Sequence, residues 1–122
     1  MKVIVIIDKY LDEREFRNYS TYWLSKLGFK SITIDDPSLN DEDSTNNNDF
    51  KATKRNKEYT IQTFLNQNIT EKEVEETLID MEKEHVENGI IVTNKEVSEE
   101  FIKYAKEKKI EIIDRSKFTE DI

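Results

Sequence analysis

The residues of this chain that could do chemistry are carboxylates, amides and amines. It has no cysteine and a single histidine, His85, in 122 residues. Thiolate metal sites and the usual histidine-rich zinc clusters are therefore excluded. Any bound metal would have to be a hard cation held by oxygen atoms. Acids stand at or beside the predicted strand boundaries, at Asp8, Asp35, Asp36 and Asp49.

The charge balance bears on the partners that this surface could bind. The formal net charge is −8, from 19 basic and 27 acidic residues. Affinity for nucleic acid rests largely on Lys and Arg neutralising phosphates, so the surface as a whole should repel DNA. One stretch departs from this balance, with cations at Lys51, Lys54, Arg55 and Lys57. This stretch is the candidate nucleic-acid contact. Alternatively, its cations only keep an exposed hairpin in contact with water.

The N-terminal elements that would position these residues are a strand and a helix. Residues 2–8 form a continuous β-branched run, which predicts a strand buried on both faces. A helix should begin at Asp12, because Asp12 and Glu15 have the spacing of a capping box, and should end at Gly28. Its inner face is predicted from residues at helical spacing: Phe16, Tyr19, Trp23 and Leu27.

The middle of the chain is predicted to hold three strands and a polar loop. Residues 30–34 alternate polar and apolar as a half-buried strand does. Residues 38–48 contain one apolar side chain among acids and amides, which indicates a mobile acidic loop. Residues 50–53 and 59–64 are short strands, joined by a polar hairpin loop at 54–57.

The last third alternates helices and strands. Thr70 and Glu73 form a second capping box, and the helix they begin should end near residues 88–89. Its inner stripe is Val74, Leu78, Met81 and His85, which makes His85 a partly buried residue. A strand at 89–93, a helix at 98–108 that buries Phe101, Ile102 and Ala105, and a strand at 110–113 follow. This alternation predicts parallel pairing.

The element order from residue 12 and three stretches of sequence carry a resemblance to a known family. The stretches are EFRNY at 15–19 leading to LGF at 27–29, DFKA at 49–52 followed by YTIQ at 59–62, and GIIVTN at 89–94 through YA at 104–105 to IEIID at 110–114. They resemble the Mrr-type restriction endonuclease-like domains of the PD-(D/E)XK nuclease superfamily. The resemblance implies one α/β domain over residues 1–122, a three-layer sandwich with a central mixed β-sheet flanked by helices.

The resemblance also assigns site residues, and one of them breaks the family's pattern. The metal-binding aspartate maps to Asp49 and the glutamine of the Gln-X-Lys motif to Gln62, but the lysine position is Phe64. Phosphodiester hydrolysis of this kind needs carboxylates for Mg²⁺ and a cation to position the attacking water. Phenylalanine supplies neither. We therefore expect a degenerate active site that neither cuts DNA nor holds a metal or other cofactor.

Two further positions depart from the family's pattern. Where many members carry an acid on the first helix, this chain has Arg17, which would repel a metal, although Glu13 or Glu15 could reach in from a neighbouring turn. The glycines that usually precede the aspartate are replaced by asparagines at 46–48.

Three other interpretations stay open at this level. In the first, the chain is an active Mg²⁺-dependent endonuclease that uses Asp49, Gln62 and a displaced lysine, Lys51. Lys51 lies two residues after Asp49 and thus on the same strand face. In the second, Asp49 only ends the acidic loop and Gln62 bonds to a neighbouring strand. In the third, Asp8, Asp35 and Asp36 gather at strand ends like the acidic pocket of receiver-type signalling domains.

The leading hypothesis is a non-catalytic domain of nuclease-like fold with a nucleic-acid-associated or protein-interaction role. Its partners would be DNA, bound weakly, or another protein. The longest apolar run, residues 3–7, is far short of the ~20 residues that cross a bilayer. We therefore expect a cytoplasmic protein with no membrane partner. The sequence leaves the oligomeric state open.

Overall fold

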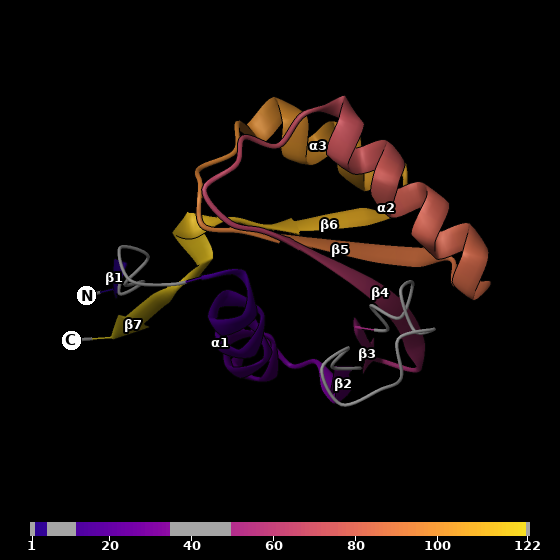
Figure 1. Ribbon diagram of the computed structural model, residues 1–122. Coiled ribbons are helices and arrows are strands. Elements are labelled where there is room, and N and C mark those ends of the chain that lie inside the picture. Colours follow the sequence, from indigo (N-terminus) through magenta and orange to yellow (C-terminus); the bar gives the residue numbers. More distant parts are fainter. Residues whose placement is uncertain (1, 5–11, 35–49, 122) are drawn as a thin grey trace.

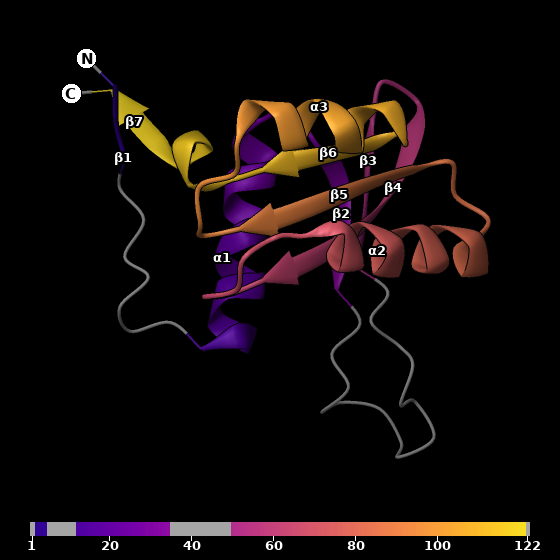
Figure 2. The ribbon, with the colours of Figure 1, turned by 90° about the horizontal axis from the view of Figure 1, so that it is seen from above.

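A five-stranded mixed sheet forms the centre of the molecule, with helices on both of its faces (Figures 1 and 2). The computed structural model describes residues 2–4, 12–34 and 50–121. Helix α1 (Glu13–Lys26) covers one face of the sheet, and α2 (Glu71–Glu84) and α3 (Glu99–Glu107) cover the other. The predicted three-layer α/β sandwich is confirmed. The strands of the sheet are β2 (Lys30–Ile34), β3 (Phe50–Lys54), β4 (Lys57–Phe64), β5 (Asn88–Thr93) and β6 (Ile110–Ile113).

The strand order follows the chain, β2-β3-β4-β5-β6, and the pairing changes type in the middle. β2, β3 and β4 pair antiparallel, whereas β5 is parallel to β4 and β6 is parallel to β5. The parallel pairing predicted for the last third is therefore confirmed. Because α2 and α3 connect the parallel strands, both helices lie on the same face.

The hairpin between β3 and β4 is tighter than the sequence suggested. Both strands extend further than predicted, so that Lys54 pairs with Lys57 and only Arg55 and Asn56 form the loop. Their φ angles are 53° and 66°. Two successive residues with positive φ are typical of the two-residue turns that match strand twist. The predicted four-residue loop is therefore wrong, because two of its residues continue the ladder.

Helix α1 builds the core on its face of the sheet as predicted. The carboxylate of Asp12 caps the helix and accepts a hydrogen bond from the Glu15 amide at 2.7 Å. Phe16 and Trp23 are buried, with exposed fractions of 0% and 2%. They pack with buried residues of the sheet and of the C-terminal segment: Phe29, Phe50, Ala52, Ile61, Ile90, Val92, Ile113 and Phe118.

A second apolar cluster lies beneath α2 and α3. Its buried members are Phe64, Val74, Met81, Ile91, Ala105, Ile110 and Ile112. Ala105 is buried as predicted, but Phe101 and Ile102 are only partly buried. The ring of Phe101 packs beside that of Tyr104, with centroids 5.3 Å apart, at the margin of the cluster. The prediction of a buried Phe101 was wrong because α3 lies over the edge of the sheet.

Helix α2 begins where predicted and ends earlier. The capping box of Thr70 and Glu73 is present, but the helix ends at Glu84. His85 follows in the left-handed conformation with φ of 57°, and its side chain is exposed. The amide of the buried Val86 bonds to the Met81 carbonyl at 2.9 Å. Val86 thus takes the inner position that the helical spacing had assigned to His85.

The N-terminal strand lies outside the central sheet. β1 (Lys2–Ile4) pairs antiparallel with β7 (Thr119–Asp121) in a separate two-stranded sheet, seen beside α1 in Figure 1. The strand predicted for residues 2–8 is therefore present at residues 2–4, in this separate sheet, and residues 5–8 fall outside the described part. The mixed sheet without β1 also lacks the all-parallel order that the receiver-type interpretation requires.

The C-terminal segment, which was not predicted, closes the core beside α1. The 3-10 helix η3 (Arg115–Lys117) leads to Phe118 and β7. Phe118 is fully buried, and its ring lies edge-on to Trp23 with a centroid distance of 5.6 Å. The ring of Phe118 thus joins this end of the chain to α1 and to the core cluster on that face of the sheet.

Glu73 makes the stability of α2 sensitive to acid. Glu73 is 4% exposed, and its carboxylate accepts hydrogen bonds from the Thr70 amide, the Thr70 hydroxyl and Gln67, at 2.6, 2.6 and 2.7 Å. Burial raises the pKa of Glu73, but these hydrogen bonds outweigh burial, so the pKa lies below the usual glutamate value. The stabilisation is complete above the unfolded-state pKa and is lost as pH falls through the lower folded-state pKa.

We predict that Glu73→Gln will lower the free energy of unfolding at pH 7 by about 1–2 kcal/mol. As pH falls below the unfolded-state pKa, the free energy of unfolding should also decrease less in this variant than in the wild type. Urea denaturation at neutral and acidic pH measures both effects, and Glu75→Gln, at an exposed position of the same helix, is the matched control. Equal acid sensitivity in the wild type and Glu73→Gln would contradict the assignment.

Candidate functional site

Phe64, at the position where the resemblance requires a lysine, is part of the apolar core. It stands at the end of β4 and is 8% exposed. It belongs to the cluster under α2 that includes Val74, Met81 and Ile91. The structure therefore places a largely buried aromatic ring where a nuclease would need a hydrated cation.

Gln62 is held by a helix rather than by a neighbouring strand. Its Nε2 donates a hydrogen bond to Oδ2 of Asp80 on α2, at 3.2 Å. The hydroxyl of Thr60 donates to the same oxygen at 2.8 Å. The interpretation in which Gln62 bonds to a neighbouring strand is thus wrong, because its partner, Asp80, lies on helix α2. The sequence signal for Asp80, which we did not single out, is its place beside Met81 on the predicted inner stripe.

Lys51 lies on the same sheet face and also contacts α2. Its Cα pairs with that of Thr60, and side chains paired across two strands share a face. Its Nζ lies 2.8 Å from Oε2 of Glu84, one turn beyond Asp80. We call Lys51, Thr60, Gln62, Asp80 and Glu84 the α2-facing polar cluster. It brings together two predicted site residues, Lys51 and Gln62, with two acids that were not predicted.

A small pocket separates Phe64 from the start of α1. It has a volume of about 190 Å³ and is lined by Glu13, Phe16, Arg17, Thr63, Phe64, Leu65 and Gln67. Arg17 and Phe64, the two positions that depart from the family's pattern, therefore line the same hollow. Glu13 also reaches it, whereas Glu15 is exposed and does not line it. The guanidinium of Arg17 at this pocket opposes the binding of a divalent cation.

The carboxylates of the α2-facing polar cluster are already engaged by other side chains. Among residues 2–4, 12–34 and 50–121, no three acids or histidines lie close enough to hold a metal ion. Mg²⁺ sites normally rest on one or two carboxylates plus substrate phosphates. In the polar cluster, Asp80 is already hydrogen-bonded to Thr60 and Gln62, and Glu84 to Lys51. Asp49, like Asp8, Asp35, Asp36 and the loop at 38–48, lies outside the described residues.

The cations of the β3–β4 hairpin do not form one patch. Lys51 pairs with Glu84, and Nζ of Lys54 lies 4.8 Å from the centroid of the Phe29 ring. Arg55 and Lys57 are exposed at the turn. Of the four predicted contacts with nucleic acid, these two are therefore the better placed to meet a phosphate.

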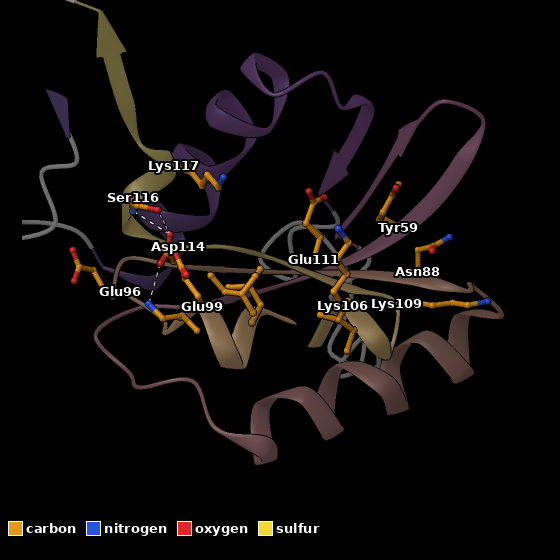
Figure 3. Close-up of a pocket in the computed structure, with 14 residues that line it drawn as sticks. Tyr59, Asn88, Glu96, Glu99, Lys106, Lys109, Glu111, Asp114, Ser116 and Lys117 are labelled. Carbon is orange, nitrogen blue, oxygen red and sulfur yellow. Dashed lines mark hydrogen bonds between the residues drawn. The ribbon is translucent and has the colours of Figure 1, made fainter. Parts of the chain in front are cut away.

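A larger groove, which the sequence did not predict, runs along β6 and α3 (Figure 3). Its volume is about 760 Å³, within the range of small-molecule sites, but its lining mixes cations, acids and aliphatic side chains. Burial and the nearby Glu111 carboxylate raise the pKa of Tyr59 at one end of the groove, and Arg55 partly opposes them. The groove exists because β6 is the outer strand, which depends on the sheet order.

Comparison with known proteins assigns the family. In the part of the chain that the structure describes, no helix is long and apolar enough to span a membrane. No curated protein and no solved structure matches the chain. A family model of the Mrr catalytic domain, described as a restriction endonuclease, matches residues 8–122. By this match over nearly its whole length, and with the sheet that the resemblance implies, the chain belongs to the Mrr restriction endonuclease family.

Proposed function

We propose that this chain is a non-catalytic member of the Mrr family that acts by binding rather than by cutting DNA. The observation that carries the proposal is the burial of Phe64 in the apolar cluster under α2. A lysine head group at this position would have to displace that packing to reach solvent. A nuclease fold can persist without its chemistry, because function resides in the site and not in the scaffold.

The surroundings of Phe64 support the same conclusion. Arg17 brings a positive charge to the pocket where a metal would need an acid. The side chains of Gln62 and Lys51 are each engaged by a carboxylate of α2. The hydrogen bond to Asp80 fixes the orientation of the Gln62 amide through Nε2, whereas Mg²⁺ would bind the amide oxygen. We therefore expect no metal-dependent step from the described residues.

Association with nucleic acid is expected to be weak. Members of a nuclease family are suited to contact DNA, and Arg55 and Lys57 stand exposed at the hairpin turn. The net charge of −8 opposes such binding. With so few cations available, the binding should depend steeply on salt and disappear between roughly 50 and 200 mM. Partner proteins are the other class of ligand that this proposal includes.

The test is a plasmid nicking assay beside a salt-series binding assay. We predict no cleavage by the wild type with Mg²⁺ or Mn²⁺. The variant with alanine at Lys51, Lys54, Arg55 and Lys57 should lose any DNA binding. The double variant Arg55→Ala with Lys57→Ala should lose nearly as much, whereas Lys51→Ala alone should lose little, since Lys51 is already paired with Glu84.

The second candidate function is an active endonuclease with a displaced lysine. One observation favours it, because Lys51 and Gln62 share a face of neighbouring strands, with Asp80 and Glu84 beside them. Such an enzyme would use Asp49, Gln62 and Lys51 and would need Mg²⁺. Metal-dependent nicking that both Asp49→Ala and Lys51→Ala abolish, and that Lys57→Ala leaves intact, would overturn the non-catalytic proposal in favour of this one.

A further inference from the structure

The outer edge of β6 has no strand partner among the described residues. β6 is the last strand of the central sheet and pairs only with β5 there. The Gly89 amide donates to the Lys109 carbonyl at 2.9 Å, which directs that carbonyl toward β5. Since backbone groups alternate sides along a strand, the N–H and C=O groups of Ile110 and Ile112 point to the outer edge. Both residues line the groove of about 760 Å³.

The two faces of the sheet present different side chains along this edge. Ile110 and Ile112 belong to the apolar cluster under α3, and Ile102 of α3 packs against that cluster and lines the groove. Glu111 points to the other face, because side chains alternate along a strand, and it is exposed. Its carboxylate raises the pKa of Tyr59, which packs in the cluster of that face. A strand added at this edge would therefore meet aliphatic side chains on one face and an acid on the other.

The two ends of the groove carry opposite charge. Lys106 and Lys109 lie toward the start of β6, and Glu96 and Glu99 lie toward its end (Figure 3). All four side chains are exposed. Lys117 also lines the acidic end, where the two glutamates outnumber it. A ligand that follows β6 would therefore need a negative end beside the lysines and a positive end beside the glutamates.

We propose that an extended segment of a partner protein binds in this groove as an added strand, antiparallel to β6. Adding a strand to an exposed sheet edge is a recurring mode of peptide recognition, and antiparallel pairing is slightly the more stable. Exposed edges are usually blocked by proline, by a bulge or by inward-pointing charge. β6, with the sequence IEII, contains no proline, and its register with β5 is unbroken. Its edge is therefore open to pairing.

The groove also defines the sequence of that segment. Aliphatic residues stand opposite Ile110 and Ile112, because residues paired across two strands share a face. The residue between them faces Glu111 and is basic. The C-terminal end of the segment lies beside the lysines of the groove and is acidic, while its N-terminal end lies beside the glutamates and is basic. A peptide with both ends capped and the sequence Lys-Thr-Val-Lys-Val-Glu meets all of these requirements.

Two other occupants match these charges less well. A second β6, paired antiparallel through Ile110 and Ile112, would set Glu111 opposite its own copy, and like charges directly opposite one another destabilise a strand pair. Nucleic acid would bring phosphates close to Glu96, Glu99 and Glu111, which repel them. The inference rests on the proposed binding role, for which it supplies a class of protein partner, but the groove is separate from the α2-facing polar cluster.

N-methylated peptides test the addition of a strand. Fluorescence anisotropy measures the binding of labelled peptide to the full chain, without DNA or metal, and we expect saturable binding of Lys-Thr-Val-Lys-Val-Glu. N-methylation of either valine should weaken binding by roughly tenfold or more, because both valine amides donate to carbonyls of β6. N-methylation of the central lysine should leave binding nearly unchanged, because its amide points away from β6.

An exchange of charge tests the position of the peptide. Glu111→Lys should weaken binding of this peptide by roughly tenfold. A second peptide, with glutamate in place of the central lysine, should bind Glu111→Lys more tightly than it binds the wild type, by a similar factor. Glu76→Lys, the same change at an exposed position of α2, is the matched control and should bind the first peptide as the wild type does. Circular dichroism verifies the fold of each variant.

Four results would overturn the proposal. The first is no binding of the parent peptide at protein concentrations up to about 1 mM. The second is equal binding of all the N-methylated peptides, which would reduce the interaction to attraction between charges. The third is loss of binding only on methylation of the central lysine, which would mean parallel addition. The fourth is an unchanged affinity in Glu111→Lys, which would place the peptide elsewhere. Peptide binding decides this inference, whereas plasmid nicking decides the non-catalytic proposal.

Discussion

Trp23→Ala should lower the free energy of unfolding by about 3–5 kcal/mol, the usual cost of truncating a buried aromatic residue. The indole is 2% exposed. Its ring contacts Tyr19, Tyr22 and Phe118, with centroid distances of 6.0, 5.5 and 5.6 Å. Removing it opens a cavity between α1 and the C-terminal segment. Urea denaturation followed by circular dichroism measures the change, since the variant has lost the chain's one tryptophan.

Two controls separate packing from other roles of this residue. Trp23→Phe keeps an aromatic ring and removes an indole N–H that is buried without a hydrogen-bond partner among the described residues. It should therefore cost less than about 1.5 kcal/mol. Tyr22→Ala, on the same helix but 51% exposed, should cost less than about 1 kcal/mol. A loss below about 1 kcal/mol for Trp23→Ala would show that α1 does not anchor the C-terminal segment.

The elements that local sequence could predict are those defined by neighbouring residues. Asp12 and Thr70 cap their helices as predicted, because a capping signal lies within four residues of chain, and the full capping box forms at Thr70. β2 and β6 have the predicted bounds, because a short apolar or alternating run is enough to mark a strand. Spacing along α1 also identified Trp23 as buried.

The elements that the sequence did not predict depend on distant residues. His85 fits the helical spacing of α2, but the amide of Val86 ends the helix by bonding to Met81. β7 requires β1 as its partner across nearly the whole chain. Phe101 fits an apolar stripe, yet its burial depends on α3 lying over the edge of the sheet. Periodicity carries no information on any of these tertiary contacts.

The candidate site also has one part that the sequence predicted and another that depends on tertiary contacts. Alignment to the family's motif placed Phe64 at the lysine position, and the structure shows that this position is closed by packing. Neither the motif nor the spacing could show that Asp80 and Glu84 engage Gln62 and Lys51, because that contact depends on how α2 is rotated over the sheet. The groove along β6 could likewise not be predicted, because it depends on the order of the strands in the sheet.

Phe64→Lys should destabilise the domain rather than restore a nuclease. Phe64 is 8% exposed and packs against Val74, Met81 and Ile91. Replacing the ring removes this packing and brings an ammonium group to the margin of an apolar cluster. We expect a loss of about 3–5 kcal/mol in the free energy of unfolding. Phe64→Leu, which keeps an apolar side chain, should cost about 1–2 kcal/mol, and urea denaturation of both variants measures the difference.

The same variant tests how much of the active site survives around that position. We expect no plasmid nicking by Phe64→Lys with Mg²⁺ or Mn²⁺, because Arg17 stays in the pocket beside it and Asp80 still holds Gln62. Arg17→Glu combined with Phe64→Lys would remove one of these two obstacles and should still be inactive. A stable Phe64→Lys protein that nicks DNA, and loses that activity with Asp49→Ala, would mean that a single substitution separates this chain from a working endonuclease. The α2-facing polar cluster would then be part of an active site rather than a structural support.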